Sequence, residues 1–165
     1  MGLMKKILSN GYIAILPILF WNIFLTSKLP KAFDPKVFNS DIPLAIIICE
    51  NIFRTLIFLM PLFFRLNITS SIHIKGVVIY SFGVLLYFVS WLLLIYEPTS
   101  IWSTSILGFA APSYTPVIWL IGLSMLVKSY TFNWVYSKWH FILPSIAFSI
   151  FPTQFMYIIE AIKKI

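Results

Sequence analysis

Residues Pro43–Phe64 read PLAIIICENIFRTLIFLMPLFF, an apolar stretch long enough to cross a lipid bilayer as a helix. The only strongly polar residues in this stretch are Glu50, Asn51 and Arg54. A charged side chain at mid-membrane costs several kcal/mol unless it is paired or reaches water. The stretch therefore predicts a membrane helix whose polar residues have a role in packing or in function.

The composition of the whole chain indicates an integral membrane protein. Of its 165 residues, 60% are hydrophobic and 10% are charged, and the mean hydropathy is +0.94. A soluble domain carries about 25% charged residues. The length fits one transmembrane domain that spans residues 1–165.

The net charge of +7 comes from basic residues in short polar connections between apolar runs. This pattern is typical of topology signals and of contacts with anionic lipid, so we expect the lipid bilayer and not nucleic acid as a partner. The single cysteine, Cys49, cannot form an intrachain disulfide or a CxxC pair. His73 and His140 lie far apart in the sequence, and we expect neither a metal site nor a cofactor.

The apolar runs predict an all-α bundle of about five transmembrane helices. A signal peptide is the alternative for the first run, but no small-x-small cleavage site follows it. The expected spans are Gly11–Thr26, Pro43–Phe64, Gly76–Tyr96, Tyr114–Val127 and Phe141–Ile159.

Between the third and fourth spans lies Thr99–Thr115, a charge-free stretch that reads TSIWSTSILGFAAPSYT. It is consistent with a short interfacial or re-entrant helix, or with the first part of a longer, kinked fourth helix. Proline lacks a backbone donor and disfavours helical geometry at the preceding residue. Pro112 and Pro116 therefore predict a break in regular helix between Ala110 and Pro116, near the outer interface.

The distribution of Lys and Arg predicts the orientation of the chain. The N-terminal side holds Lys5, Lys6, Arg65, Lys75, Lys128 and Lys138. The other side holds Lys28, Lys31, Lys36, Lys163 and Lys164, and its connection after the third span carries no Lys or Arg. We expect a cytoplasmic N-terminus and an outer C-terminus. The short loops favour a plasma membrane, specifically a bacterial inner membrane.

Glu50 and Arg54 are four residues apart, so they share one helix face and can form an ion pair. Asn51, beside them, can hydrogen-bond to a neighbouring helix. One interpretation is a polar pocket in which Arg54 meets an anionic group or Glu50 takes up a proton or cation. The other is a self-satisfied pair that only fixes helix packing.

A polar stripe on the third span supports the pocket interpretation. Its members recur at helical spacing: Tyr80, Gly83, Tyr87, Ser90 and Trp91. The hydroxyl groups are expected to satisfy Glu50 and Arg54, and Gly83 is expected to allow close helix approach. The fifth span has a similar stripe at Ser145, Ser149, Thr153 and Tyr157. The alternative is ordinary hydrogen bonding between helices.

A second candidate region holds Trp102, Ser103, Ser105, Tyr114 and Trp119, which we expect near one interface. A proline-containing, hydroxyl-rich segment at a membrane edge can line a cavity. The alternative is an aromatic belt that anchors the chain at headgroup depth.

These patterns favour a non-enzymatic membrane protein that binds or helps translocate a small amphipathic molecule or lipid. The expected ligand-binding residues are Glu50, Asn51, Arg54, Tyr80, Tyr87, Trp91, Trp102 and Tyr114. The first alternative is an accessory or immunity-type protein that packs against a larger membrane partner or a second copy. The second is a membrane enzyme with Glu50 as acid/base, which is weaker because the adjacent arginine stabilises the ionised carboxylate. No catalytic residue is assigned.

Overall fold

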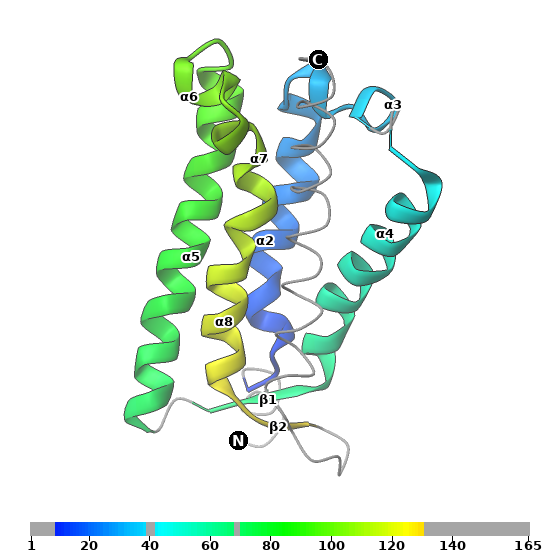
Figure 1. The fold of residues 1–165 in the computed structure, drawn as a ribbon. Coiled ribbons are helices and arrows are strands. Elements are labelled where there is room, and N and C mark those ends of the chain that lie inside the picture. Colours follow the sequence, from blue (N-terminus) through cyan, green and yellow to red (C-terminus); the bar gives the residue numbers. More distant parts are fainter. Residues whose placement is uncertain (1–8, 39–41, 68–69, 131–165) are drawn as a thin grey trace.

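The computed structural model describes residues 9–38, 42–67 and 70–130, and this part of the chain is mostly helical (Figure 1). The main helices are α2 (Tyr12–Leu25), α4 (Leu44–Leu59), α5 (Ser71–Tyr96), α7 (Ile106–Tyr114) and α8 (Pro116–Leu126). Shorter elements connect them: η1 (Thr26–Lys28), η2 (Lys31–Phe33), α3 (Pro35–Phe38), η3 (Met60–Phe63) and α6 (Ile101–Thr104).

Three helical segments are long and apolar enough to cross a membrane, namely Leu44–Phe63, Ser71–Tyr96 and Ile106–Leu126. The helix at Tyr12–Lys28 is apolar but shorter. These segments are compatible with the membrane location and with the helical fold class expected from the sequence. A count of five is not established, because the expected span Phe141–Ile159 lies outside the described residues.

Helix α5 begins at Ser71, five residues before the expected start at Gly76. Ser70 and His73 form a reciprocal capping box, in which the Ser70 N–H donates to His73 Nδ1 at 3.4 Å. Such a cap satisfies backbone donors that the first helical turn leaves without partners. His73 and Lys75, which the sequence placed in a polar connection, therefore belong to the helix.

The expected break between Ala110 and Pro116 is found at Thr115, which separates α7 from α8, although the two helices together form one membrane-length segment. Thr115 has helical dihedral angles (φ −59°, ψ −30°), and its N–H bonds to the Ala111 carbonyl at 3.0 Å. The Thr115 hydroxyl donates to the same carbonyl at 2.7 Å. Each proline removes one backbone donor, and hydroxyl groups in this turn add bonds to its carbonyls.

A second interruption lies earlier, at Ser105, which separates α6 from α7. Its backbone is extended (φ −75°, ψ 154°), and its hydroxyl accepts from the Gly108 N–H at 3.1 Å. Ser105 is thus the N-cap of the long segment Ile106–Leu126. The stretch Thr99–Thr115 is thus divided: α6 is a short separate helix, and the residues from Ile106 onward form the first part of the longer fourth helix, which was the second expected interpretation.

The described residues also contain two short strands, which an all-α prediction missed. Strand β1 (Phe64–Leu66) pairs antiparallel with β2 (Val127–Tyr130), with Arg65 opposite Ser129. The Gly11 N–H donates to the Phe64 carbonyl at 3.0 Å. Pairing between segments so distant in sequence leaves no local pattern to detect. The sheet joins the ends of α2, α4 and α8.

Helices α5 and α8 approach each other closely at glycines. A Cβ atom on Gly83 would lie 2.3 Å from the Trp119 backbone nitrogen, and one on Gly122 would lie 2.3 Å from that of Tyr80. Small residues let membrane helices bring their backbones into contact. The expected role of Gly83 is confirmed. Trp119 lies at this contact and is only 2% exposed, so its side chain packs within the bundle.

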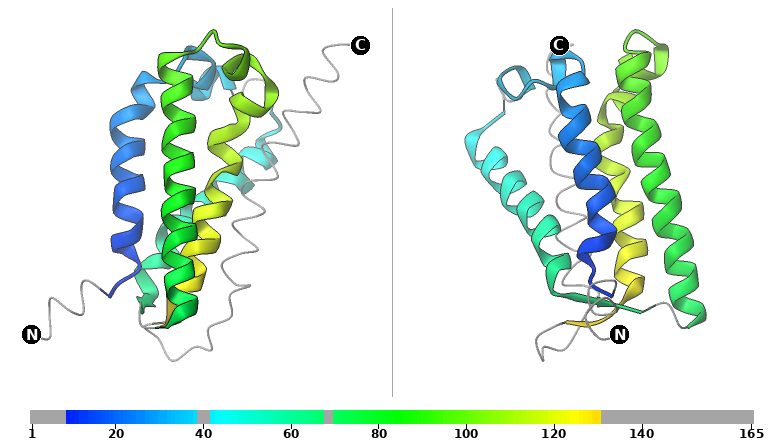
Figure 2. Two further views of the ribbon diagram at one scale, coloured as in Figure 1. Left: turned by 90° about the vertical axis from the view of Figure 1, so that its left-hand side faces the viewer. Right: turned by 180° about the vertical axis from the view of Figure 1, so that it is seen from behind.

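Successive long helices run in opposite directions, so their connections gather at two ends (Figures 1 and 2). The starts of α2 and α5 lie at the end that holds the sheet. Residues 26–34 and α6 lie at the other end. The described loops therefore fall into the same two groups as in the comparison of Lys and Arg residues on the two sides of the membrane. The orientation of the chain in the membrane stays a prediction.

We predict that Gly83→Leu lowers the stability of the bundle by about 3 kcal/mol or more, because the side chain would meet the backbone of α8. Ser81→Leu is the matched control, since Ser81 is exposed on the same helix. Thermal unfolding in detergent, followed by circular dichroism, measures the difference. Equal unfolding temperatures for the two variants would contradict close packing of α5 against α8 at Gly83.

We predict that Ile101→Cys reacts with an impermeant thiol reagent in intact cells, after Cys49→Ser removes the native thiol. Ile101 is 92% exposed at the end expected outside. Lys128→Cys, exposed at the other end, should react only after lysis. The reverse pattern would invert the orientation.

Candidate functional site

Helix α4 is the most loosely packed of the long helices. Only 11% of its membrane-length window is buried, compared with 50% for Ile106–Leu126. Helix α4 meets the other helices at its C-terminal end and diverges from them toward its N-terminal end (Figure 2). Its exposed apolar residues, which suit contact with lipid, are Leu44, Ile48, Ile52, Leu56 and Leu59.

The charged residues of α4 lie on the side that faces the bundle. Glu50, Arg54 and Ile57 are separated by four and three residues, so they share a face. Ile57 is 3% exposed and belongs to the hydrophobic core. At 3.6 residues per turn, the exposed Ile48 and Ile52 lie on the other side of the helix.

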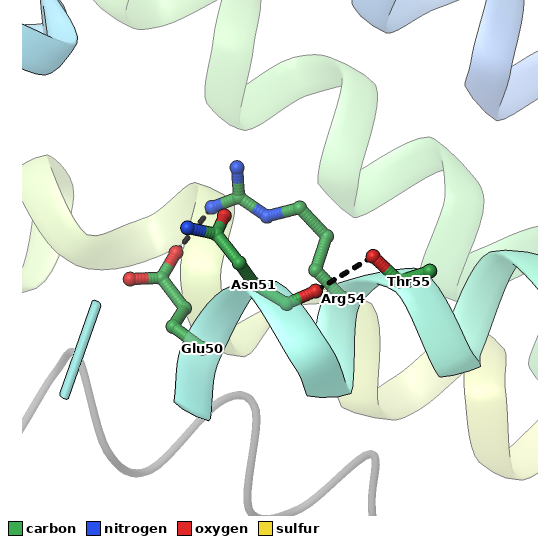
Figure 3. Close-up of polar contacts among 4 residues, drawn as sticks. All are labelled: Glu50, Asn51, Arg54 and Thr55. Carbon is green, nitrogen blue, oxygen red and sulfur yellow. Dashed lines mark hydrogen bonds and ion pairs between the residues drawn. The ribbon is translucent and has the colours of Figure 1, made fainter. Parts of the chain in front are cut away.

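The ion pair expected from the sequence is confirmed. Arg54 Nη2 donates to Glu50 Oε1, and both side chains rise from α4 (Figure 3). The Glu50 side chain is 12% exposed, whereas that of Arg54 is 52% exposed. The site is thus a nearly covered carboxylate beside a half-exposed guanidinium.

Asn51 and Thr55 add polar atoms to the neighbouring side of α4. Asn51 is exposed, and the Thr55 hydroxyl donates to the Asn51 carbonyl at 2.7 Å (Figure 3). This bond keeps the Thr55 hydroxyl within its own helix, a usual arrangement for threonine in membrane helices.

The tyrosine hydroxyls of α5 bond to α2 and not to the ion pair. Tyr80 donates to the Ala14 carbonyl, and Tyr87 donates to Asn22 Oδ1 at 2.7 Å. The Ser90 hydroxyl donates to the Tyr87 carbonyl at 2.7 Å. The expectation that these groups satisfy Glu50 and Arg54 is therefore not met: the tyrosines bond to α2, and Ser90 bonds within α5.

Asn22 contributes to the contact between α2 and α5, a role that the sequence did not predict. It is a polar residue within an apolar run, which is the signal that could have identified it as a partner for another helix. Trp91 lies in the core against Tyr87, with ring centroids 5.8 Å apart in an edge-on arrangement. Trp91 therefore packs between helices.

Trp102 and Tyr114 lie on α6 and α7, which pack chiefly on each other and on α5 and α8 (Figure 1). Each is 37% exposed, and the Tyr114 hydroxyl donates to the Leu107 carbonyl at 3.1 Å. Ser103 is buried near them. The expected site residues thus fall into three groups: the α4 face, the α2–α5 contact and the α6–α7 end.

Within the described residues, no group of three or more His, Cys, Asp or Glu side chains could hold a metal ion. No family model, no curated protein and no solved structure matches the chain.

We predict that Arg54→Ala destabilises the membrane-embedded protein by roughly 3–5 kcal/mol, because it leaves the Glu50 carboxylate without its partner. Lys75→Ala, at an exposed position, should cost less than about 1 kcal/mol. Unfolding in mixed micelles measures both variants.

A double variant tests whether the loss of stability in Arg54→Ala comes from the unpaired charge or from the smaller side chain. Glu50→Gln combined with Arg54→Ala should recover much of the lost stability, since no unpaired charge remains. Equal stability for Arg54→Ala and Lys75→Ala would show that the pair does not support the fold.

Proposed function

We propose that this chain is a non-enzymatic, multi-pass membrane protein that binds a small anionic amphipathic molecule or lipid at the α4 face and helps it cross or enter the membrane. The observation that carries the proposal is the direction and exposure of Arg54. Its guanidinium lies on the bundle side of α4, yet it is half exposed although Glu50 is its partner.

The chemistry of arginine fits an anionic ligand. The guanidinium presents five N–H donors in a planar fork that suits carboxylate and phosphate groups. Glu50 offsets the positive charge while no ligand is bound, which lowers the cost of holding Arg54 within the membrane. The apolar residues around the pair would contact the hydrocarbon part of such a ligand.

A second candidate is an accessory protein that docks α4 on a helix of a larger membrane partner or of a second copy. The loose packing of α4 favours it, since only 11% of its window is buried. In this arrangement Asn51 and Arg54 would bond across the helix contact. The purified protein would then form a defined complex and would not bind the amphiphile by itself.

We predict saturable binding of decanoate, and not of decyltrimethylammonium, to the protein in lipid nanodiscs. Arg54→Gln should weaken decanoate binding about tenfold, because a hydrogen bond to a charged group contributes roughly 1.5–3 kcal/mol. Lys75→Gln is the control and should bind as the unchanged protein does. Isothermal titration calorimetry measures all three.

Equal affinity of Arg54→Gln and the unchanged protein for decanoate would refute the proposed site. A protein that shows no decanoate binding but a stable, Arg54-dependent oligomer in mild detergent would favour the docking function.

A further inference from the structure

A cavity of about 420 Å³ lies at the end of the bundle that holds α6, apart from the charged face of α4. Its walls come from residues 30–33, the last turn of α5, and the segment from α6 into α7. Phe33 and Phe109 stack beside it with ring centroids 4.4 Å apart. The volume is within the range of small-molecule sites, about 300–1,000 Å³.

The walls of the cavity are mainly apolar. Leu94, Ile106 and Ala110 line it together with the two phenylalanines. A water-sized group occupies about 30 Å³, so the volume suits on the order of a dozen such groups. This is the size of a hydrocarbon chain segment, whose methylene groups are similar in volume.

Three hydroxyl residues also line the cavity, but their hydrogens are directed to backbone carbonyls. Ser105 donates to the Trp102 carbonyl at 2.6 Å, and Thr104 donates to the Ser100 carbonyl at 2.9 Å. Ser103 donates to the Leu93 carbonyl at 3.3 Å. The walls therefore offer few donors to a ligand, and they favour an apolar occupant.

The position of the cavity along α5 indicates its depth in a membrane. Helix α5 has 26 residues and is about 39 Å long, more than the hydrocarbon thickness of about 30 Å. Leu94 and Pro98, which line the cavity, lie at the end of this helix. Tyr96 and Trp102 are exposed nearby, as aromatic residues commonly are at headgroup depth.

The loop beside the cavity is basic. Lys31 lies between two lining residues, Pro30 and Ala32, and residues 28–36 hold three lysines against one aspartate, a net charge of 3 − 1 = +2. Glu97, next to the lining residue Pro98, reduces the local sum to +1. Lysines at this depth attract anionic headgroups.

We propose that this cavity holds a hydrocarbon chain of an anionic membrane lipid, with the headgroup beside Lys28 and Lys31. The apolar walls contact the hydrocarbon chain, and the lysines of the loop favour a lipid with an anionic headgroup. The site does not involve Arg54, so it stands independently of the function proposed above.

The test uses nanodiscs that contain phosphatidylglycerol or phosphatidylcholine with a photoreactive diazirine in one acyl chain. After illumination, mass spectrometry of peptides locates the labelled residues. We expect phosphatidylglycerol to label peptides that contain Phe33 or Phe109 more strongly than phosphatidylcholine does. Lys28→Gln with Lys31→Gln should reduce this labelling roughly tenfold, whereas Lys75→Gln should leave it unchanged.

A cavity-filling variant tests the chain site directly. Ala32→Trp should abolish the labelling at Phe109, and Ala45→Trp, at an exposed alanine on α4, is the matched control. Ile106→Trp fills the opposite wall, should Ala32→Trp prevent folding. Labelling that persists in the filled variants, or that is uniform over α4 and the cavity, would overturn the proposal. Equal labelling by the two lipids would overturn the anionic selection.

Discussion

The contact of α5 with α8 at Gly83 and Gly122 is the constraint on which the rest of the described fold depends. In a bilayer, apolar side chains gain little by leaving lipid for another helix, so close backbone packing must hold helices together. The two glycines leave room for the partner backbone, and the backbone of Trp119 lies directly against Gly83. With this pair fixed, Tyr80 and Tyr87 on α5 are positioned to bond to α2.

Helix α4 is held differently, and this difference creates the candidate site. Its C-terminal end continues through η3 into β1, which pairs with β2 and bonds to Gly11. Toward its N-terminal end α4 diverges from the other helices (Figure 2). Relative to the described helices, α4 can thus keep a charged pair on its inner face without fully burying it, and this is the arrangement of Glu50 and Arg54.

The sequence predicted the parts of this structure that local patterns determine. Hydropathy located the long helices, and the four-residue spacing predicted the pair of Glu50 and Arg54. Pro112 and Pro116 predicted the interruption that lies at Thr115 between α7 and α8. The partners of the tyrosine hydroxyls on α2 were missed, because they depend on which helices are neighbours. Composition and periodicity do not encode such contacts.

The two proposed binding regions combine polar and apolar groups in opposite ways. At the α4 face, polar groups lie among apolar residues, and their cost within lipid is lowered by pairing Arg54 with Glu50. At the α6 end, the hydroxyl groups donate to carbonyls within the chain, so the cavity is mainly apolar, and it lies beside a basic loop. An amphipathic anion has both kinds of surface. Its charge would be recognised by Arg54 at one region and by loop lysines at the other, while its chain would contact apolar walls in each. The shared chemistry follows from one property of the sequence, namely basic residues placed within a long apolar run, as Arg54 is, or next to one, as the loop lysines are.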